Sequence, residues 1–162
     1  MQSLMIVAAL LGFVQPVQDL QALSCQASEK GIPIVVYVSR SDCTYCMRME
    51  REVLGPLMRA QVLNNKALIR ELVSDQQGLA RDFDGQQTTP ANIAARYSAT
   101  ITPTLLFLSS AGVEVHPRIM GYNGSEYYSY YLERAVAAAA KQQSKAPDCA
   151  SGDATPSTGD AR

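Results

Sequence analysis

A buried strand that leads directly into a helix with two cysteines in its first turn is the feature that most restricts this fold. Residues 34–38 form an uninterrupted β-branched and aromatic run without polar alternation, as expected for a strand covered on both faces. The Ser-Asp pair at 41–42 supplies N-cap chemistry, and residues 43–54 lack Gly and Pro and are rich in helix formers. The pattern places Cys43 at the start of this helix and Cys46 one turn deeper.

The remaining segments predict a layered α/β fold. Strands are expected at residues 34–38, 67–73, 104–108 and 113–120, and helices at residues 18–29, 43–54, 57–63, 90–97 and from 124 onward. The short turn at 109–112 favours an antiparallel hairpin, and the polar residues 74–89 are expected to form an extended loop. We therefore expect a central mixed four-stranded sheet with helices on both faces.

Three local signals refine the helix boundaries. Gly-Pro at 55–56 is expected to break or kink the second helix, and Thr-Pro at 89–90 is a typical helix start. Asn123 and Glu126 have the spacing of a capping box. In the helix that follows, Tyr128, Tyr131, Leu132, Ala135 and Val136 lie on one stripe, so the sheet-packing face is expected to include Tyr128 and Tyr131 but not Tyr127 or Tyr130.

The two ends of the chain differ from its middle. The apolar run at 4–14 has the length of a signal-peptide core and falls short of the ~20 residues of a membrane-spanning helix. No Lys or Arg precedes Lys30 and no clean cleavage site follows, so a buried helix or strand is the alternative. The expected division is a signal peptide or apolar segment at 1–17, a domain at 18–142 and a disordered tail at 143–162. We therefore expect export, to the periplasm or its equivalent, and no membrane span in the mature protein.

Charge and histidine content exclude other classes of function. The chain has 14 Lys and Arg against 15 Asp and Glu, so no basic surface is available for nucleic acid. The single histidine, His116, lies beside Pro117 in a predicted surface strand and is expected to be solvated rather than catalytic. No cofactor is expected.

The Cys-x-x-Cys pair at 43–46 has three readings. As half of a zinc or copper site it would need further ligands from Cys25, Cys149 or His116, which lie on separate predicted segments. As a purely structural disulfide it would contribute little, because the loop it closes is short. As a redox dithiol it meets the physical requirements together, since strand, turn, cysteine pair and helix follow in the right order.

The redox reading assigns different roles to the two sulfurs. Free backbone N–H groups and the helix dipole at the helix start favour a thiolate at Cys43, so its pKa should lie below the ~8.5 of a free cysteine. Cys46 lies a turn deeper and is less exposed. It can attack the mixed disulfide formed by Cys43 and so release the reduced partner.

The motifs around this pair resemble the thioredoxin superfamily. The resemblance is carried by residues 34–38, by Cys-Thr-Tyr-Cys at 43–46, and by Ile-Thr-Pro-Thr at 101–104 before the third strand, and it covers residues 19 to 141. Residues 43–53 and 82–85, with 97–104 beyond, resemble more narrowly the exported, periplasmic thioredoxin-like proteins of proteobacteria, some of which are associated with sulfur oxidation.

This resemblance implies roles for five residues. Cys43 matches the attacking cysteine and Cys46 the resolving one. Pro103 matches the cis-proline that faces the pair, and Tyr45, Thr102 and Pro103 are the expected substrate contacts. An ordinary proline at a strand start is the alternative for Pro103. The implied partners are protein disulfides and a membrane electron donor.

Three positions depart from the thioredoxin pattern. Asp42 replaces the usual Trp and places a negative charge beside Cys43. Thr-Tyr at 44–45 replaces Gly-Pro, so the redox potential does not follow from the motif. Tyr37 stands where thioredoxin has a buried acid that accepts the proton of the resolving cysteine.

Glu50 is the candidate for that missing proton acceptor. It follows Cys46 by four residues and therefore lies on the same face of the helix. The alternative is that Glu50 turns outward and pairs with Arg48 or Arg51 in solvent.

The other two cysteines allow several states. The Ala-Leu-Ser-Cys sequence at 22–25 loosely resembles a lipobox, but a packed thiol on the first helix is the expected state of Cys25. Cys149 in the tail could be free, pair with Cys25 or pair between chains.

Together these observations predict an exported thiol–disulfide oxidoreductase that acts on protein partners through Cys43 and Cys46, with reduction the favoured direction. The alternatives are a thioredoxin-like metal-binding or chaperone module without redox turnover, and a partner protein whose cysteines only stabilise its fold.

Overall fold

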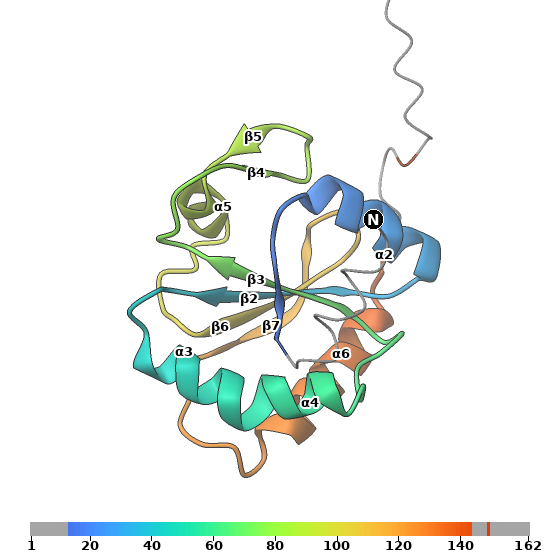
Figure 1. The fold of residues 1–162 in the computed structure, drawn as a ribbon. Helices are drawn as coiled ribbons and strands as arrows, with labels where there is room; N and C mark the ends of the chain where they lie inside the picture. The colour runs from blue at the N-terminus through green and yellow to red at the C-terminus, as the bar shows by residue number, and fades with distance from the viewer. Residues whose placement is uncertain (1–12, 144–148, 150–162) are drawn as a thin grey trace, which may run out of the picture.

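A computed structural model of the protein describes residues 13–143 and residue 149. The core of the predicted signal peptide up to residue 12, and the predicted tail apart from Gln143 and Cys149, lie outside the described residues. Figure 1 shows a mixed sheet with helices on both faces, so the predicted α/β class and thioredoxin fold are confirmed. No helix in the described part of the chain is long and apolar enough to cross a membrane.

The sheet has five strands rather than the predicted four. Their spatial order is β1 (Gln15–Pro16), β3 (Leu68–Val73), β2 (Ile34–Ser39), β6 (Thr104–Leu108) and β7 (Glu114–Met120). β1, β3 and β2 run parallel, whereas β6 and β7 are each antiparallel to their neighbours. The additional strand, β1, has only two residues, which is too short to give a period. Val14 beside it is buried in the core, so residues 14–16 belong to the folded unit.

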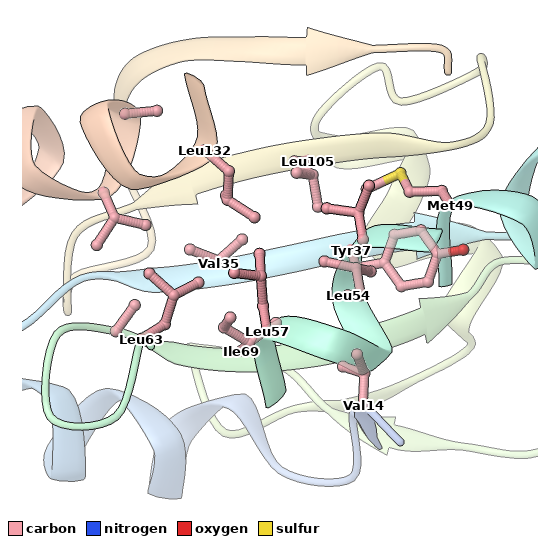
Figure 2. Packing of buried hydrophobic residues seen from close by; sticks show 14 of the residues in the cluster. Val14, Val35, Tyr37, Met49, Leu54, Leu57, Leu63, Ile69, Leu105 and Leu132 are labelled. Carbon is pink, nitrogen blue, oxygen red and sulfur yellow. The ribbon is translucent and has the colours of Figure 1, made fainter. Parts of the chain in front are cut away.

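The helices form two layers. α2 (Leu20–Lys30) and α5 (Pro90–Arg96) cover one face of the sheet, and α3 (Thr44–Met49), α4 (Gly55–Arg59) and α6 (Tyr128–Ala140) cover the other (Figure 1). Every residue of β2 is buried, as the apolar run predicts for a central strand. Figure 2 shows the side chains that β2 directs toward α3, α4 and α6, among them Val35 and Tyr37.

The Gly-Pro pair does not interrupt the second helix as expected. A π-helical turn at Glu50–Leu54 joins α3 to α4, and the N–H of Gly55 donates to the carbonyl of Glu50. Pro56 has no N–H and its ring would clash with the carbonyl four residues earlier, and the widened turn accommodates both effects. The helix ends at Arg59, so the predicted helical segment 57–63 is wrong beyond that point.

The start of α6 also differs from the prediction. The helix begins at Tyr128, and the residue before it makes no capping hydrogen bond through its side chain. The predicted cap at Asn123 is wrong because Gly124, which would follow it in the helix, has φ of 144°. The buried stripe of α6 contains Tyr128 but not Tyr131, which is 60% exposed.

The segment at 74–89, predicted to be an extended loop, contains a small hairpin of β4 (Ala80–Arg81) and β5 (Gln87–Thr88). Buried Asp82 forms an ion pair with Arg96 of α5, which holds the hairpin on that helix. Thr89 caps α5 and accepts from the N–H of Asn92, as the Thr-Pro start predicts.

Candidate active site

The two cysteines lie where the end of β2 passes into α3. Cys43 is the N-cap of α3, and its Sγ accepts a hydrogen bond from the N–H of Cys46 at 3.1 Å. The pair forms a disulfide with Cα atoms 5.2 Å apart. Cys43 is partly exposed, whereas Cys46 is 3% exposed. This arrangement leaves one sulfur accessible to a partner and covers the other.

The residues before Cys43 do not cap the helix as the sequence suggested. The backbone N–H and the hydroxyl of Ser41 both donate to the carboxylate of Asp75, which follows β3. Asp42, whose charge would oppose a thiolate at Cys43, forms an ion pair with Arg40 at 3.4 Å. Arg40 therefore offsets part of the unfavourable charge of Asp42.

Pro103 precedes β6 at the end of the sheet where β2 leads into α3. Register pairs Val38 of β2 with Thr104, so the Thr102–Pro103 bond lies beside the end of β2 that leads to Cys43. This bond is cis, as the sequence predicted. The carbonyl of Pro103 accepts a hydrogen bond from the N–H of Gly121 at 2.7 Å. This bond joins the loop at 101–103, called the proline loop below, to the end of β7.

A recess of about 500 Å³ lies over this junction. Its lining residues are Tyr45, Arg48, Thr102, Gly121, Tyr122 and Asn123. Tyr45 is 57% exposed and Thr102 is partly exposed, whereas Pro103 is buried. Two of the predicted substrate contacts, Tyr45 and Thr102, thus border one concavity, and Pro103 does not line it.

Polar groups lie in the core next to Cys46. The Tyr37 hydroxyl donates to the carbonyl of Cys46 at 3.1 Å. Glu71 of β3 is the register partner of Tyr37, and side chains of paired neighbours in parallel strands point to the same face. The Ser39 hydroxyl donates to Glu71 at 2.6 Å. Glu71 therefore faces the same helical layer as Tyr37, on the side of the sheet that carries the cysteines.

Glu50 lies in this layer as well, in the π-helical turn. Burial raises the pKa of Glu50, and the charge of Glu71 raises it further. Burial also raises the pKa of Glu71, which the hydrogen bond from Ser39 offsets only in part. Two half-buried carboxyl groups with raised pKa values thus lie on the face of the sheet that carries the cysteine pair.

The alternative for Glu50, an ion pair with nearby arginines, is not what the structure contains. Arg48 and Arg51 both bind Glu52, at 3.4 and 3.1 Å. Glu52 also accepts from the Tyr122 hydroxyl at 2.6 Å, and this bond together with the arginines lowers the pKa of Glu52 to about 2. Within the described residues, Glu50 takes part in no ion pair.

Glu71 is the site residue that sequence reasoning missed. The available signal was a carboxylate next to Arg70 in a strand, Leu68–Val73, whose other four residues are apolar. Its role depends on strand register, because only the pairing with Tyr37 brings Glu71 beside the position at which thioredoxin has a buried acid.

A second disulfide lies away from the site. Cys25 of α2 is bonded to Cys149, with Cα atoms 5.2 Å apart. The expected packed thiol at Cys25 is therefore wrong, and of the states left open for Cys149 the structure has the pairing within the chain. No group of three or more potential metal-ligating side chains is found in residues 13–143 and 149.

His116 also lies away from the cysteine pair. Its ring packs edge-on against Phe107 of β6, with ring centroids 5.4 Å apart. Its Nδ1 is 2.9 Å from the carbonyl of Pro117. These are contacts of a surface strand.

Comparison with known proteins identifies the family. Residues 21–136, well over half of the chain, match the family described as thioredoxin-like domain, and the protein belongs to that family. Among curated proteins, none matches the chain.

Solved structures share the fold at low sequence identity. One is described as DsbH oxidoreductase, with a TM-score of 0.57, 18% identity, and coverage of 76% of this chain and 85% of that one. A thioredoxin from Thermus thermophilus has a TM-score of 0.54 and 22% identity, with coverage of 75% of this chain and 87% of that one. Fasciola hepatica thioredoxin has a TM-score of 0.52 and 21% identity, with coverage of 76% of this chain and 97% of that one. At these identities the likeness shows the thioredoxin fold alone.

Proposed function

We propose that this protein is an exported thiol–disulfide oxidoreductase that reduces disulfides of protein partners through Cys43 and Cys46. The observation that carries the proposal is the difference between the two sulfurs. Cys43 is partly exposed at a helix start and accepts a backbone N–H, whereas Cys46 is covered. A partner can reach the first sulfur and not the second.

The reaction begins with the dithiol form. The Cys43 thiolate attacks one sulfur of the partner disulfide, an S–S bond of the partner breaks, and its second sulfur leaves as a thiolate. Cys46 then loses its proton and attacks the Cys43 sulfur of the mixed disulfide. The Cys43–Cys46 bond forms, and the first partner sulfur leaves. The partner gains two electrons and the protein loses two, which an external dithiol or membrane electron donor must restore.

The proton of Cys46 needs an acceptor, and the Glu50 and Glu71 pair supplies it in this proposal. A base accepts a proton from a thiol more readily when its pKa lies closer to that of the thiol. Burial raises the pKa of both carboxyl groups in this direction. Burial raises the pKa of Tyr37 and the charges of Glu71 and Glu50 raise it further, so both carboxyl groups lie near the hydroxyl that donates to the carbonyl of Cys46.

The proposed compartment is the periplasm or another exported location, as for the proteobacterial proteins that the motifs resemble. The long-range disulfide between Cys25 and Cys149, which has no part in the proposed redox cycle, supports an oxidising compartment. The apolar run at 4–14 supports an export signal. The membrane electron donor belongs to the same proposal, because a reductase in an oxidising compartment needs reducing equivalents from elsewhere.

A trapping experiment tests the activity. Cys46→Ser leaves the mixed disulfide without its resolving thiol, so full-length protein should accumulate partners covalently bound to Cys43 that reductant releases. Cys43→Ser is the matched control and should trap none. Trapping through neither cysteine, together with stoichiometric metal binding by the wild-type pair, would contradict the proposal and support a metal-binding module.

The direction of electron flow is tested separately. Equilibration with glutathione or dithiothreitol buffers gives the reduction potential of the Cys43–Cys46 pair. A reductase is expected to have a reduction potential of about −270 mV, as for thioredoxin, whereas a value of about −120 mV would assign the protein as an oxidant.

A further inference from the structure

A groove between β7 and α6 extends the surface around the cysteines. It has a volume of about 640 Å³. Its helical wall is a stripe at 128, 131, 134, 135 and 138, which is the spacing of one helix face, and its strand wall includes Ile119 and Met120. Two of the five stripe residues are alanines, Ala135 and Ala138, and their small side chains leave the groove open.

The groove is continuous with the recess beside the disulfide. Gly121, Tyr122 and Asn123 line both. A Cβ atom placed on Gly121 would meet nothing within 4 Å, so the space above this shared wall is open. Because the N–H of Gly121 also donates a hydrogen bond to Pro103, the joined recess and groove begin at the proline loop and extend along β7.

The groove presents apolar surface to solvent. Met120 is 58% exposed and Tyr131 is 60% exposed, although neither contributes to the core. Contiguous exposed apolar surface rimmed by polar groups is typical of an interaction site.

The charges of the groove have one sign. Arg134 lines the groove and donates to the Tyr130 hydroxyl, whereas Arg48, which lines the recess, is already paired with Glu52. Carboxylate side chains are absent from both linings in the described part of the chain. Arg134 takes part in no ion pair among residues 13–143 and 149. An acidic side chain is therefore the complement that Arg134 lacks.

We propose that this groove binds an extended, apolar segment of the partner polypeptide that carries an acidic side chain and adjoins the cysteine attacked by Cys43. The inference rests on the proposed function, because the mixed disulfide is what holds a partner chain at the mouth of the groove. Attachment there raises the effective concentration of the adjoining segment in the groove. From Met120 to His116 the strand wall is about 13 Å long, so the segment spans about four residues.

Two peptide disulfides test this inference with the reduced, full-length protein. Both contain the same cysteine in a mixed disulfide. One continues into three apolar residues and a Glu, and the other into four Gly and Ser residues, with each extension placed on either side of the cysteine. Stopped-flow rate constants are expressed relative to 2-hydroxyethyl disulfide, which is too small to occupy the groove. For one of the two orientations, the apolar acidic extension should react about tenfold faster than the Gly-Ser extension.

Variants of α6 locate the effect. Ala138→Leu fills the groove and should abolish the tenfold preference, whereas Ala137→Leu, on the exposed adjacent position outside the groove, should retain it. With a third peptide that carries Lys in place of Glu, Arg134→Glu should exchange the preference for the Glu extension for one for the Lys extension. This reversal serves as an independent test if Ala138→Leu disturbs the helix.

The outcomes separate the inference from the function on which it rests. Equal rates for both extensions in the wild-type protein, with normal reduction of 2-hydroxyethyl disulfide, would overturn the groove and leave the oxidoreductase intact. A dimer in sedimentation that Ala138→Leu dissociates would also overturn it, because a second copy would then be the occupant. Failure to reduce any disulfide, the small one included, would instead remove the proposed function.

Discussion

The two disulfides of this protein have the same Cα separation, 5.2 Å, and nearly opposite surroundings. Cys43 and Cys46 are three residues apart within the first turn of a helix. Cys25 and Cys149 are 124 residues apart and connect α2 to a point beyond α6. A cross-link restricts the unfolded chain in proportion to the logarithm of the loop it closes. The Cys25–Cys149 bond is therefore expected to contribute more to the free energy of unfolding than the Cys43–Cys46 bond, whose expected role is thiol–disulfide exchange.

The largest expected effect is on stability. Cys25→Ser with Cys149→Ser should lower the free energy of unfolding by about 3–4 kcal/mol, because the bond closes a long loop. Cys43→Ser with Cys46→Ser should lower it by no more than about 2 kcal/mol, because that loop is short. Urea unfolding followed by circular dichroism measures both. Equal losses from the two double variants would remove the distinction between the bonds.

The second prediction concerns reduction. In graded redox buffers the Cys43–Cys46 bond should open first, with the Cys25–Cys149 bond more negative in potential by at least about 60 mV, which corresponds to about 2.8 kcal/mol. Alkylation of free thiols followed by peptide mass spectrometry identifies which pair has opened at each potential. Simultaneous opening, or earlier opening of Cys25–Cys149, would contradict the assignment of redox chemistry to residues 43 and 46.

The third prediction concerns the acids beneath the short bond. Glu71→Gln and Glu50→Gln should each slow the release of partner from the mixed disulfide about tenfold at neutral pH, because a positioned base accelerates proton transfer. The first attack by Cys43 should change less. Single-turnover kinetics with a fluorescent peptide disulfide separates the two steps. Glu52→Gln is the matched control, since Glu52 binds Arg48 and Arg51 instead.

The same carboxyl groups predict a pH dependence of stability. Burial raises the pKa of Glu71 in the folded protein, so its contribution is fully present below the ordinary carboxyl range and is lost as pH rises through the raised pKa. Stability measured relative to Glu71→Gln should therefore fall from about pH 4 to neutral pH. A relative stability that rises over this range would mean that Glu71 is held as a favourable carboxylate.

Much of the fold followed from the sequence because its signals are local. The apolar run of β2, the Cys-x-x-Cys helix start and the Thr-Pro cap of α5 each depend on a few adjacent residues. The missed elements depend on distant ones or are very short. β1 has two residues, and Gly124 excludes a capping box through a backbone conformation that the residue type allows but does not require.

The site divides in the same way. Motifs predict Cys43, Cys46 and Pro103 as site residues, and the structure brings the Cys43 end of β2 and the Pro103 end of β6 together through antiparallel pairing. Glu71 required the register of β3 against β2, and the partner of Cys25 lies in a tail with little apolar content. Neither long-range pairing leaves a periodic trace in the sequence.

The ionisation of Cys43 tests the central claim most directly. In protein reduced selectively at residues 43 and 46, the thiolate absorbance near 240 nm or the pH dependence of alkylation gives the pKa of the accessible cysteine. A value clearly below the ~8.5 of a free thiol is predicted, with Cys46 titrating higher. A pKa of Cys43 at or above ~8.5 would contradict the account, because an ordinary thiol at that position would not attack partner disulfides at neutral pH.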